Sequence, residues 1–226
     1  MKRSEINRII KEAIEFLDAM KFKLPPFAHW TPERWAAAGP ESDEIWENQL
    51  GWDITNFGGD DFFKLGLTIF TLRNGNIANP TDKKLYAEKV LISEEEQVTP
   101  MHFHRSKMED IINRGGGNLV MKVYNSTPNG KLADTPVTVS LDGVMRTAPA
   151  GSLIKLQPGE SVTVTPLLYH SFWAEKGAGK LLIGEVSSVN DDHTDNFFYD
   201  EIGRFPRIEE DEPPFRLLMT EYPGRK

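Results

Sequence analysis

A regular succession of short strands constrains this chain more than any other feature of its sequence. From Asp61 onward, runs rich in β-branched and aromatic residues recur at intervals of about eight to twelve residues. Turn signals such as Asp142-Gly143 and Pro158-Gly159 separate these runs. This spacing predicts an antiparallel sandwich or jelly-roll barrel. The predicted strands are 62–72, 85–93, 100–104, 110–113, 119–124, 137–141, 152–156, 161–165, 169–174 and 181–187.

The region before these strands is predicted to be helical. Between Ser4 and Met20, apolar residues recur at i, i+3 and i+4, which is typical of an amphipathic helix with one buried face. The predicted fold class is therefore mainly β, a barrel with an N-terminal α-helical extension. We expect three parts: a helical extension packed on the barrel (1–60), the β-barrel (61–188), and an acidic segment that covers or flanks the barrel (189–226). Its acidic run 209–212 is expected to be solvated surface.

Composition excludes several classes of function. The chain has no cysteine, so a disulfide, a thiolate-zinc site and a cysteine nucleophile are impossible, and a cytoplasmic location is expected. The net charge is −8 without a cluster of basic residues, which argues against nucleic acid as a partner. No long apolar run is present, so neither a membrane span nor a signal peptide is predicted.

Histidines and glutamates form the pattern that carries chemistry. His102 and His104 are spaced i, i+2, which puts both imidazoles on one face of a strand. A hairpin that turns at Ser106-Lys107 is expected to place Glu109 opposite His104. A second hairpin, turning at 176–179, is expected to place Glu185 opposite His170. Together these residues predict a site with three imidazole nitrogens and at least one carboxylate oxygen.

Such a ligand set suits Mn²⁺, Fe²⁺, Zn²⁺, Ni²⁺ or Co²⁺ better than Ca²⁺. A chance histidine pair is the alternative, and the additional glutamate and histidine argue against it. The other two histidines, His29 and His193, are expected at packed or exposed surface positions.

The range 66–188 resembles a cupin, a double-stranded β-helix or jelly-roll fold. The first cupin motif is matched by His102, His104, Glu109 and Gly116, and the second by His170 after Pro158-Gly159. A closer resemblance, over nearly the whole chain, is to the D-lyxose isomerases. It is carried by the stretches 89–91, 97–104, 107–117, 184–187, 190–192 and 203–205.

The resemblance to D-lyxose isomerases implies several properties. The metal ligands are His102, His104, Glu109 and His170, and the ion is a divalent metal, commonly Mn²⁺. The activity is interconversion of D-lyxose with D-xylulose, and often of D-mannose with D-fructose. The expected protein is a cytoplasmic homodimer whose partner is a monosaccharide.

The residues also suggest a mechanism. Four protein ligands leave about two positions on a six-coordinate ion for neighbouring sugar oxygens, and isomerisation needs no organic cofactor. Glu185 is the leading candidate for the base, with a second interpretation as a further ligand or a partner that orients His170. Further candidates are Lys107 and Asp192 for catalysis, and Lys89, Gln97 and Arg204 for substrate binding. Asp192 and Arg204 belong to the acidic segment, which is expected to fold over the mouth of the barrel.

Three other functions remain open from the sequence. A sugar-phosphate isomerase requires a basic cluster near the mouth of the barrel, and little of one is visible. A non-catalytic sugar-binding cupin keeps the barrel without turnover. An Fe²⁺ oxygenase is compatible with a histidine and carboxylate ligand set.

Overall fold

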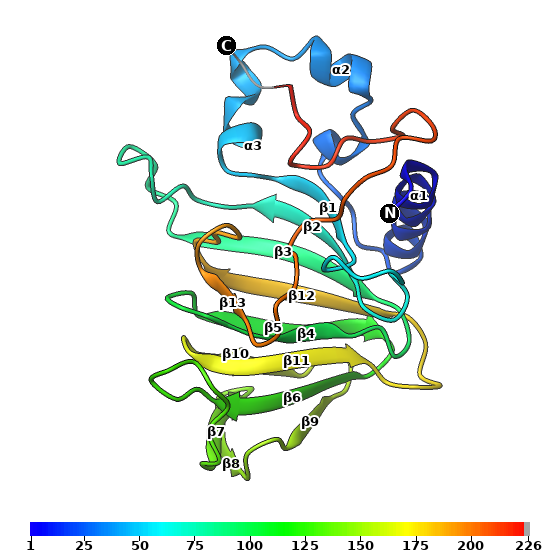
Figure 1. Cartoon of the computed structure of the whole chain (residues 1–226). Helices are drawn as coiled ribbons and strands as arrows, with labels where there is room; N and C mark the ends of the chain where they lie inside the picture. The colour runs from blue at the N-terminus through cyan, green and yellow to red at the C-terminus, as the bar shows by residue number, and fades with distance from the viewer. Residues whose placement is uncertain (224–226) are drawn as a thin grey trace.

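Two antiparallel sheets face each other and enclose the interior of a barrel (Figure 1). The computed structural model describes residues 1–223. One sheet has eight strands in the order β1 (Gly51–Thr55), β2 (Leu67–Arg73), β3 (Tyr86–Ser93), β12 (Leu181–Ser188), β5 (Glu109–Gly116), β10 (Ser161–Val164), β7 (Val137–Leu141) and β8 (Val144–Ala148). The other has five, in the order β13 (Asn196–Phe198), β4 (Thr99–His104), β11 (Leu168–Ala174), β6 (Leu119–Asn125) and β9 (Leu153–Leu156).

The core lies between the inner faces of the two sheets. Along β5, Glu109, Ile111 and Asn113 are buried, whereas Asp110 and Ile112 are only partly buried. This period of two follows from the pleat of a strand, which sends successive side chains to opposite faces. Apolar side chains of both sheets meet in one cluster, and the predicted mainly β fold is confirmed.

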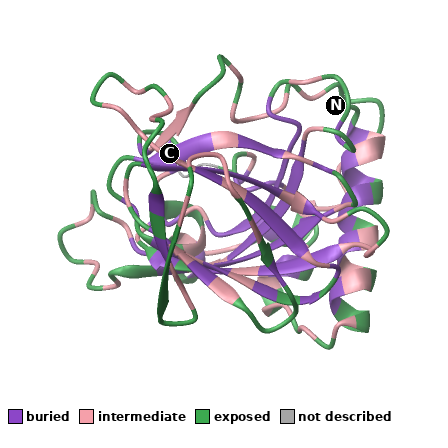
Figure 2. Cartoon of the chain, turned by 90° about the horizontal axis from the view of Figure 1, so that it is seen from below, coloured by how far each residue is buried: buried purple, intermediate pink, exposed green. Residues whose placement is uncertain are grey.

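Helix α1 (Arg3–Ala19) covers part of the outer face of the eight-stranded sheet. Its apolar stripe, which includes Ile6, Ile10 and Leu17, packs against Phe70 of β2 and Leu182 of β12. Figure 2 shows the buried side of the helix turned toward the strands. Each fully buried isoleucine or leucine contributes about 1.5–3 kcal/mol, so the stripe holds the helix on the sheet.

The other helical elements precede β1. They are α2 (Pro32–Ala36), α3 (Asp43–Glu47) and two 3-10 turns, Pro26–His29 and Pro40–Ser42. Within residues 1–223, no helix combines the length and apolar character needed to cross a membrane.

Three strands lie outside the predicted set, and each escaped prediction for a physical reason. Strand β1 falls in the range 1–60 expected to be helical, and all five of its residues are buried, so it lacks an alternating pattern. Strand β8 is mostly exposed. Strand β13 has three residues and is defined by its pairing with β4. The strand predicted at 62–72 begins only at Leu67, because a turn held by Asp61 precedes β2.

The acidic run 209–212 is exposed, as expected from the sequence, and its side chains also bind residues at the start of α1. Arg3 is 1% exposed, and its guanidinium binds the carboxylates of Glu210, at 2.6 Å, and Glu221. The next two acidic residues bond to Ser4 and Asn7. The run therefore lies along the first turn of α1, where negative charge is favoured by the helix dipole.

Candidate functional site

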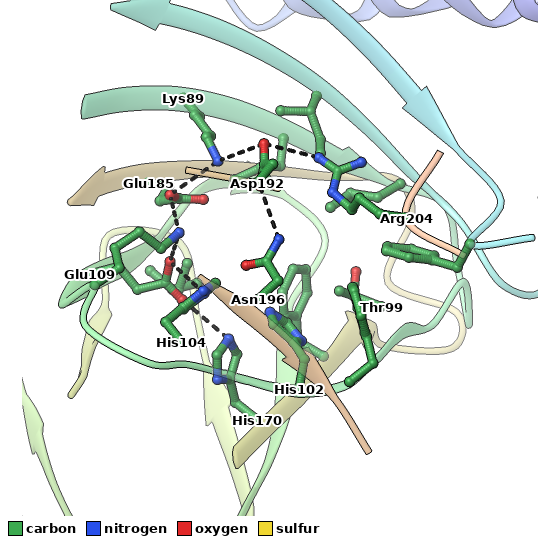
Figure 3. A pocket seen from close by; sticks show the side chains of 18 residues that line it. Lys89, Thr99, His102, His104, Glu109, His170, Glu185, Asp192, Asn196 and Arg204 are labelled. Carbon is green, nitrogen blue, oxygen red and sulfur yellow. Dashed lines mark hydrogen bonds and ion pairs between the residues drawn. The ribbon is translucent and has the colours of Figure 1, made fainter. Parts of the chain in front are cut away.

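Three buried histidines converge inside the barrel. His102 and His104 lie on the inner face of β4, and His170 on β11 is the direct cross-strand partner of His102. Their potential ligand atoms all lie within 4.8 Å of one another. Figure 3 shows the three rings pointing toward a common space.

Hydrogen bonds orient two of these rings for metal binding. Nδ1 of His102 lies 2.8 Å from the carbonyl oxygen of Pro100, and Nδ1 of His170 lies 3.0 Å from that of Leu168. A carbonyl only accepts, so Nδ1 carries the proton and Nε2 keeps its lone pair free. Within residues 1–223, the buried Nε2 of His170 has no hydrogen-bond partner. Such an atom fits a metal ligand.

Burial favours the neutral, metal-binding form of His102 and His104. It lowers the pKa of His102 well below the ordinary value, and the neighbouring His170 and His104 lower it further. Burial likewise lowers the pKa of His104, assisted by the ammonium of Lys107.

Glu109 on β5 completes the cluster from the opposite sheet. Its carboxylate oxygens lie 3.1 Å from Nε2 of His170 and 3.4 Å from Nε2 of His104. Burial alone raises the pKa of Glu109, but Lys107, at 2.6 Å, and the neighbouring His104 and His170 together outweigh burial and lower it well below the ordinary value. Glu109 is therefore an anion. Three imidazoles and a carboxylate suit a divalent transition metal, so the residues present fit the predicted ion.

The two hairpins predicted from the sequence do not exist. Strands β4 and β5 belong to different sheets, as do β11 and β12, so neither His104 and Glu109 nor His170 and Glu185 are cross-strand neighbours. His104 and Glu109 meet across the barrel interior. Glu185 pairs in register with Lys89 and Ile111 instead.

Beside the histidines, the cavity wall carries alternating charges. Glu185 lies 2.8 Å from the ammonium of Lys107 and 3.6 Å from that of Lys89. Burial opposes the charge of Lys107, but Glu109 and Glu185 outweigh it and raise its pKa above the ordinary value. Each charge is thus compensated by an opposite neighbour, which makes their burial tolerable.

The C-terminal segment closes this side of the cavity. Asp192 lies 3.8 Å from Lys89 and 3.2 Å from Arg204, and Arg204 also binds the buried Asp53. Burial raises the pKa of Asp192, but Arg204 and Lys89 lower it well below the ordinary value. Asp192 and Arg204 line the cavity together with the sequence-predicted Lys89, Lys107 and Glu185.

Gln97 is the one predicted site residue that does not line this cavity. Its side chain is fully buried elsewhere, where its amide donates to the carbonyl of Phe62 over 2.6 Å and accepts from the N–H of Glu94 over 2.9 Å. The structure therefore does not bring Gln97 to the cavity, and both ends of its amide bond to the backbone.

Several residues that the fold brings to the cavity or to its charged wall were not predicted from the sequence. Thr99 on β4 and Asn196 on β13 line it, and Phe57 and Phe198 add apolar surface. Asn190 accepts from Lys89 over 2.6 Å. Alternation along β4 predicts that Thr99 points away from the face of His102 and His104. Thr99 nevertheless lines the cavity, because the pairing of β4 with β11 shifts register between His102 and Thr99. The remaining residues come from loops and a three-residue strand.

Comparison with known proteins gives a consistent result. The model of a family described as D-lyxose isomerase matches residues 1–222. A D-lyxose/D-mannose isomerase of Serratia proteamaculans is 51% identical over 223 residues, which is 98% of each chain. One of Escherichia coli O157:H7 is 48% identical over the same share.

Solved structures resemble the fold at much lower identity. An L-ribose isomerase of Cellulomonas parahominis, with L-ribose bound, superposes with a TM-score of 0.58 at 16% identity, covering 92% of this chain and 98% of that one. One of Acinetobacter sp. DL28 gives 0.55 at 14% identity, covering 89% and 93%.

Proposed function

This chain belongs to the D-lyxose isomerase family and is a sugar isomerase, and we propose that it interconverts D-lyxose with D-xylulose and D-mannose with D-fructose. One observation carries the proposal: three buried histidines and a carboxylate converge beside a set of compensated acidic and basic groups. The relatives named for these two sugars support the choice of substrate.

His102, His104, Glu109 and His170 are the proposed ligands of a divalent ion, which we expect to be Mn²⁺. Bound there, such an ion supplies Lewis-acid polarisation of a sugar carbonyl. The carboxylate of Glu109 contributes one negative charge to this set, and Lys107 keeps it ionised.

Glu185 is the proposed base. Isomerisation takes a proton from C2 of the aldose and returns it to C1, while the hydroxyl proton on O2 moves to O1, so no electron leaves the sugar. The carboxylate of Glu185 can accept the carbon-bound proton and give it back, because it is buried and faces the cavity. Lys107, at 2.8 Å, is placed to stabilise negative charge on the sugar oxygens during this transfer.

The remaining polar groups of the cavity are proposed to hold sugar hydroxyls. Thr99 Oγ1 and Arg204 Nη1 are buried and lack a hydrogen-bond partner in the described part of the chain. A bound sugar offers hydroxyls that satisfy such groups. Lys89 and Asp192, which face each other across 3.8 Å, are the other candidates.

A sugar phosphate is a poorer fit than a free sugar. The three cations that line the cavity, Lys89, Lys107 and Arg204, all lie within 4 Å of carboxylates. A phosphate group has to displace these carboxylates before it reaches a cation, and its own charge is repelled by Glu185 and Asp192. A free sugar is uncharged, so it can bond to these groups without displacing a carboxylate and without charge repulsion.

The test is turnover by chelator-treated protein after addition of Mn²⁺. We expect conversion of D-lyxose to D-xylulose and of D-mannose to D-fructose, and none of the corresponding sugar phosphates. No turnover with any pentose or hexose, under any of the five divalent metals considered, rejects the proposal. A protein that binds metal and sugar without turnover is a sugar-binding cupin, and consumption of oxygen on adding substrate indicates an oxygenase. The homodimer and the cytoplasmic location stay predictions.

A further inference from the structure

Asp195 joins the C-terminal segment to the loop between β4 and β5. Its side chain is buried, and Oδ1 accepts from both the backbone N–H and the hydroxyl of Ser106, at 2.8 and 2.6 Å. Oδ2 accepts from the backbone N–H of Lys107 over 3.2 Å. The backbone carbonyl of Asp195 accepts from Arg105 over 2.9 Å. One residue of the covering segment thus holds the loop that carries Lys107.

The same carboxylate faces an unsatisfied atom of the histidine cluster. Nδ1 of His104 is buried and has no hydrogen-bond partner within the described residues, and Oδ2 of Asp195 lies 3.7 Å from it. His102 and His170 differ, because a backbone carbonyl orients each of them. A movement of about 0.5–1 Å brings Asp195 and His104 into hydrogen-bond distance.

A ligating histidine usually donates its second ring N–H to a carboxylate or carbonyl, which fixes its tautomer and direction. We propose that Asp195 is a positioning residue of the metal centre. It accepts the Nδ1 proton of His104, so that Nε2 faces Glu109 and the ion, and it fixes the Ser106-Lys107 loop in register with the cavity. This inference rests on the metal-dependent function proposed above.

A purely structural role of Asp195 would affect different measurements from a role in positioning His104. If Asp195 only ties two segments together, its loss lowers the stability of the protein and leaves the intrinsic affinity for metal unchanged. If it positions His104, its loss weakens metal binding in a protein that remains folded. Metal affinity and the stability of the metal-free protein therefore have to be measured separately.

The substitution Asp195→Asn preserves size and keeps Oδ1 as an acceptor for Ser106, but replaces the oxygen that faces His104 and accepts from the N–H of Lys107. Asp191→Asn is the matched control, because it removes the same charge from the same segment, where the carboxylate accepts from the backbone of His193 and Thr194. Calorimetric titration of Mn²⁺ into chelator-treated protein should give an affinity about 10- to 100-fold weaker for Asp195→Asn and unchanged for Asp191→Asn. Equal affinities for the two variants overturn the proposal.

A second measurement needs no variant and covers the case in which Asp195→Asn does not fold. In wild-type protein with ¹⁵N-labelled histidine and bound Zn²⁺, long-range ¹H–¹⁵N spectra should find the proton of His104 on Nδ1. A proton on Nε2 overturns the proposal. Wild-type protein that neither binds Mn²⁺ nor converts sugar rejects the proposed function itself, whereas normal activity with an unaffected Asp195→Asn rejects the role of Asp195 alone.

Discussion

The ammonium of Lys107 lies 2.8 Å from the carboxylate of Glu185, and both are buried inside the barrel. A buried charge needs opposite neighbours in a medium of low polarity, and each member of this pair has a second one, Glu109 for Lys107 and Lys89 for Glu185. The pair is held from two elements, the loop after β4 and strand β12. This arrangement makes the role of Glu185 testable with a substitution that keeps its shape.

Glu185→Gln should abolish most turnover while the protein keeps its metal. A positioned acid–base group contributes typically about 10²- to 10⁴-fold to the rate, so kcat should fall by that order. Metal content and kcat are measured on the same sample. Glu175→Gln, a change at an exposed pair with Lys155, serves as the control and should leave both unchanged. Loss of bound metal from Glu185→Gln would instead assign it to the ligand set.

His170→Asn should lose the metal. The substitution removes the nitrogen that faces Glu109 at 3.1 Å and leaves two imidazoles and the carboxylate of Glu109 to hold the ion. Elemental analysis after dialysis should find less than the stoichiometric amount of Mn²⁺, with turnover falling in parallel. His29→Asn changes an exposed histidine and should retain both. Full metal content in His170→Asn would exclude His170 as a ligand.

Thr99→Val should raise KM for the sugar with little change in metal content. The hydroxyl of Thr99 is buried and has no partner among residues 1–223, so a substrate hydroxyl that bonds to it contributes about 0.5–1.5 kcal/mol, or about 2- to 12-fold in KM. Thr138→Val, which removes an exposed hydroxyl bonded to Thr147, is the matched control. Steady-state kinetics with D-lyxose check the difference, and equal KM values for the two variants contradict it.

Acid should destabilise the metal-free protein in two stages. The pKa of His102 in the folded state lies below its value of 6.5 in the unfolded chain, so the unfolded chain binds protons first and stability falls below about pH 6.5. The stabilisation from ionised Glu109 is present above about pH 4.5 and is lost as pH falls toward its lower folded pKa. Urea unfolding of chelator-treated protein measures this, and a flat profile below pH 6.5 contradicts it.

Arg3→Met should destabilise the fold more than a surface substitution of the same kind. It leaves Glu221, which is 20% exposed, without the guanidinium that neutralises it, and we expect a loss of about 2 kcal/mol in the free energy of unfolding. Arg8→Met breaks an exposed i, i+4 pair with Glu12, for which about 0.5 kcal/mol or less is expected. Equal urea midpoints would show that the buried pair adds nothing.

Local patterns were enough to predict the histidines of the site, but not how they meet. The i, i+2 spacing of His102 and His104 fixes their common face on any strand, but the meeting with His170 depends on the pairing of β4 with β11. The predicted hairpins failed because the chain crosses between the sheets after β4 and again after β11. Glu109 nevertheless reaches His104, since the inner faces of both sheets look onto the same interior.

The residues that were missed, or that lie away from the cavity against expectation, depend on contacts between distant parts of the chain. Asp195 was one acidic residue among several until the fold brought it beside Ser106, and Gln97 was assigned to substrate although its amide bonds to Phe62. Strand β13 exists because β4 offers it a partner. No local periodicity encodes such pairings, so they could not be predicted from the sequence.

The buried ion pair of Arg3 has a consequence for synthesis on the ribosome. Arg3 is synthesised before the carboxylates that neutralise it, Glu210 and Glu221, which follow it by more than 200 residues. Until then its guanidinium has to stay in water, so helix α1 cannot complete its docking. Nascent chains arrested before Glu210 should therefore expose this helix to chaperones and proteases even after the strands of the barrel have been made.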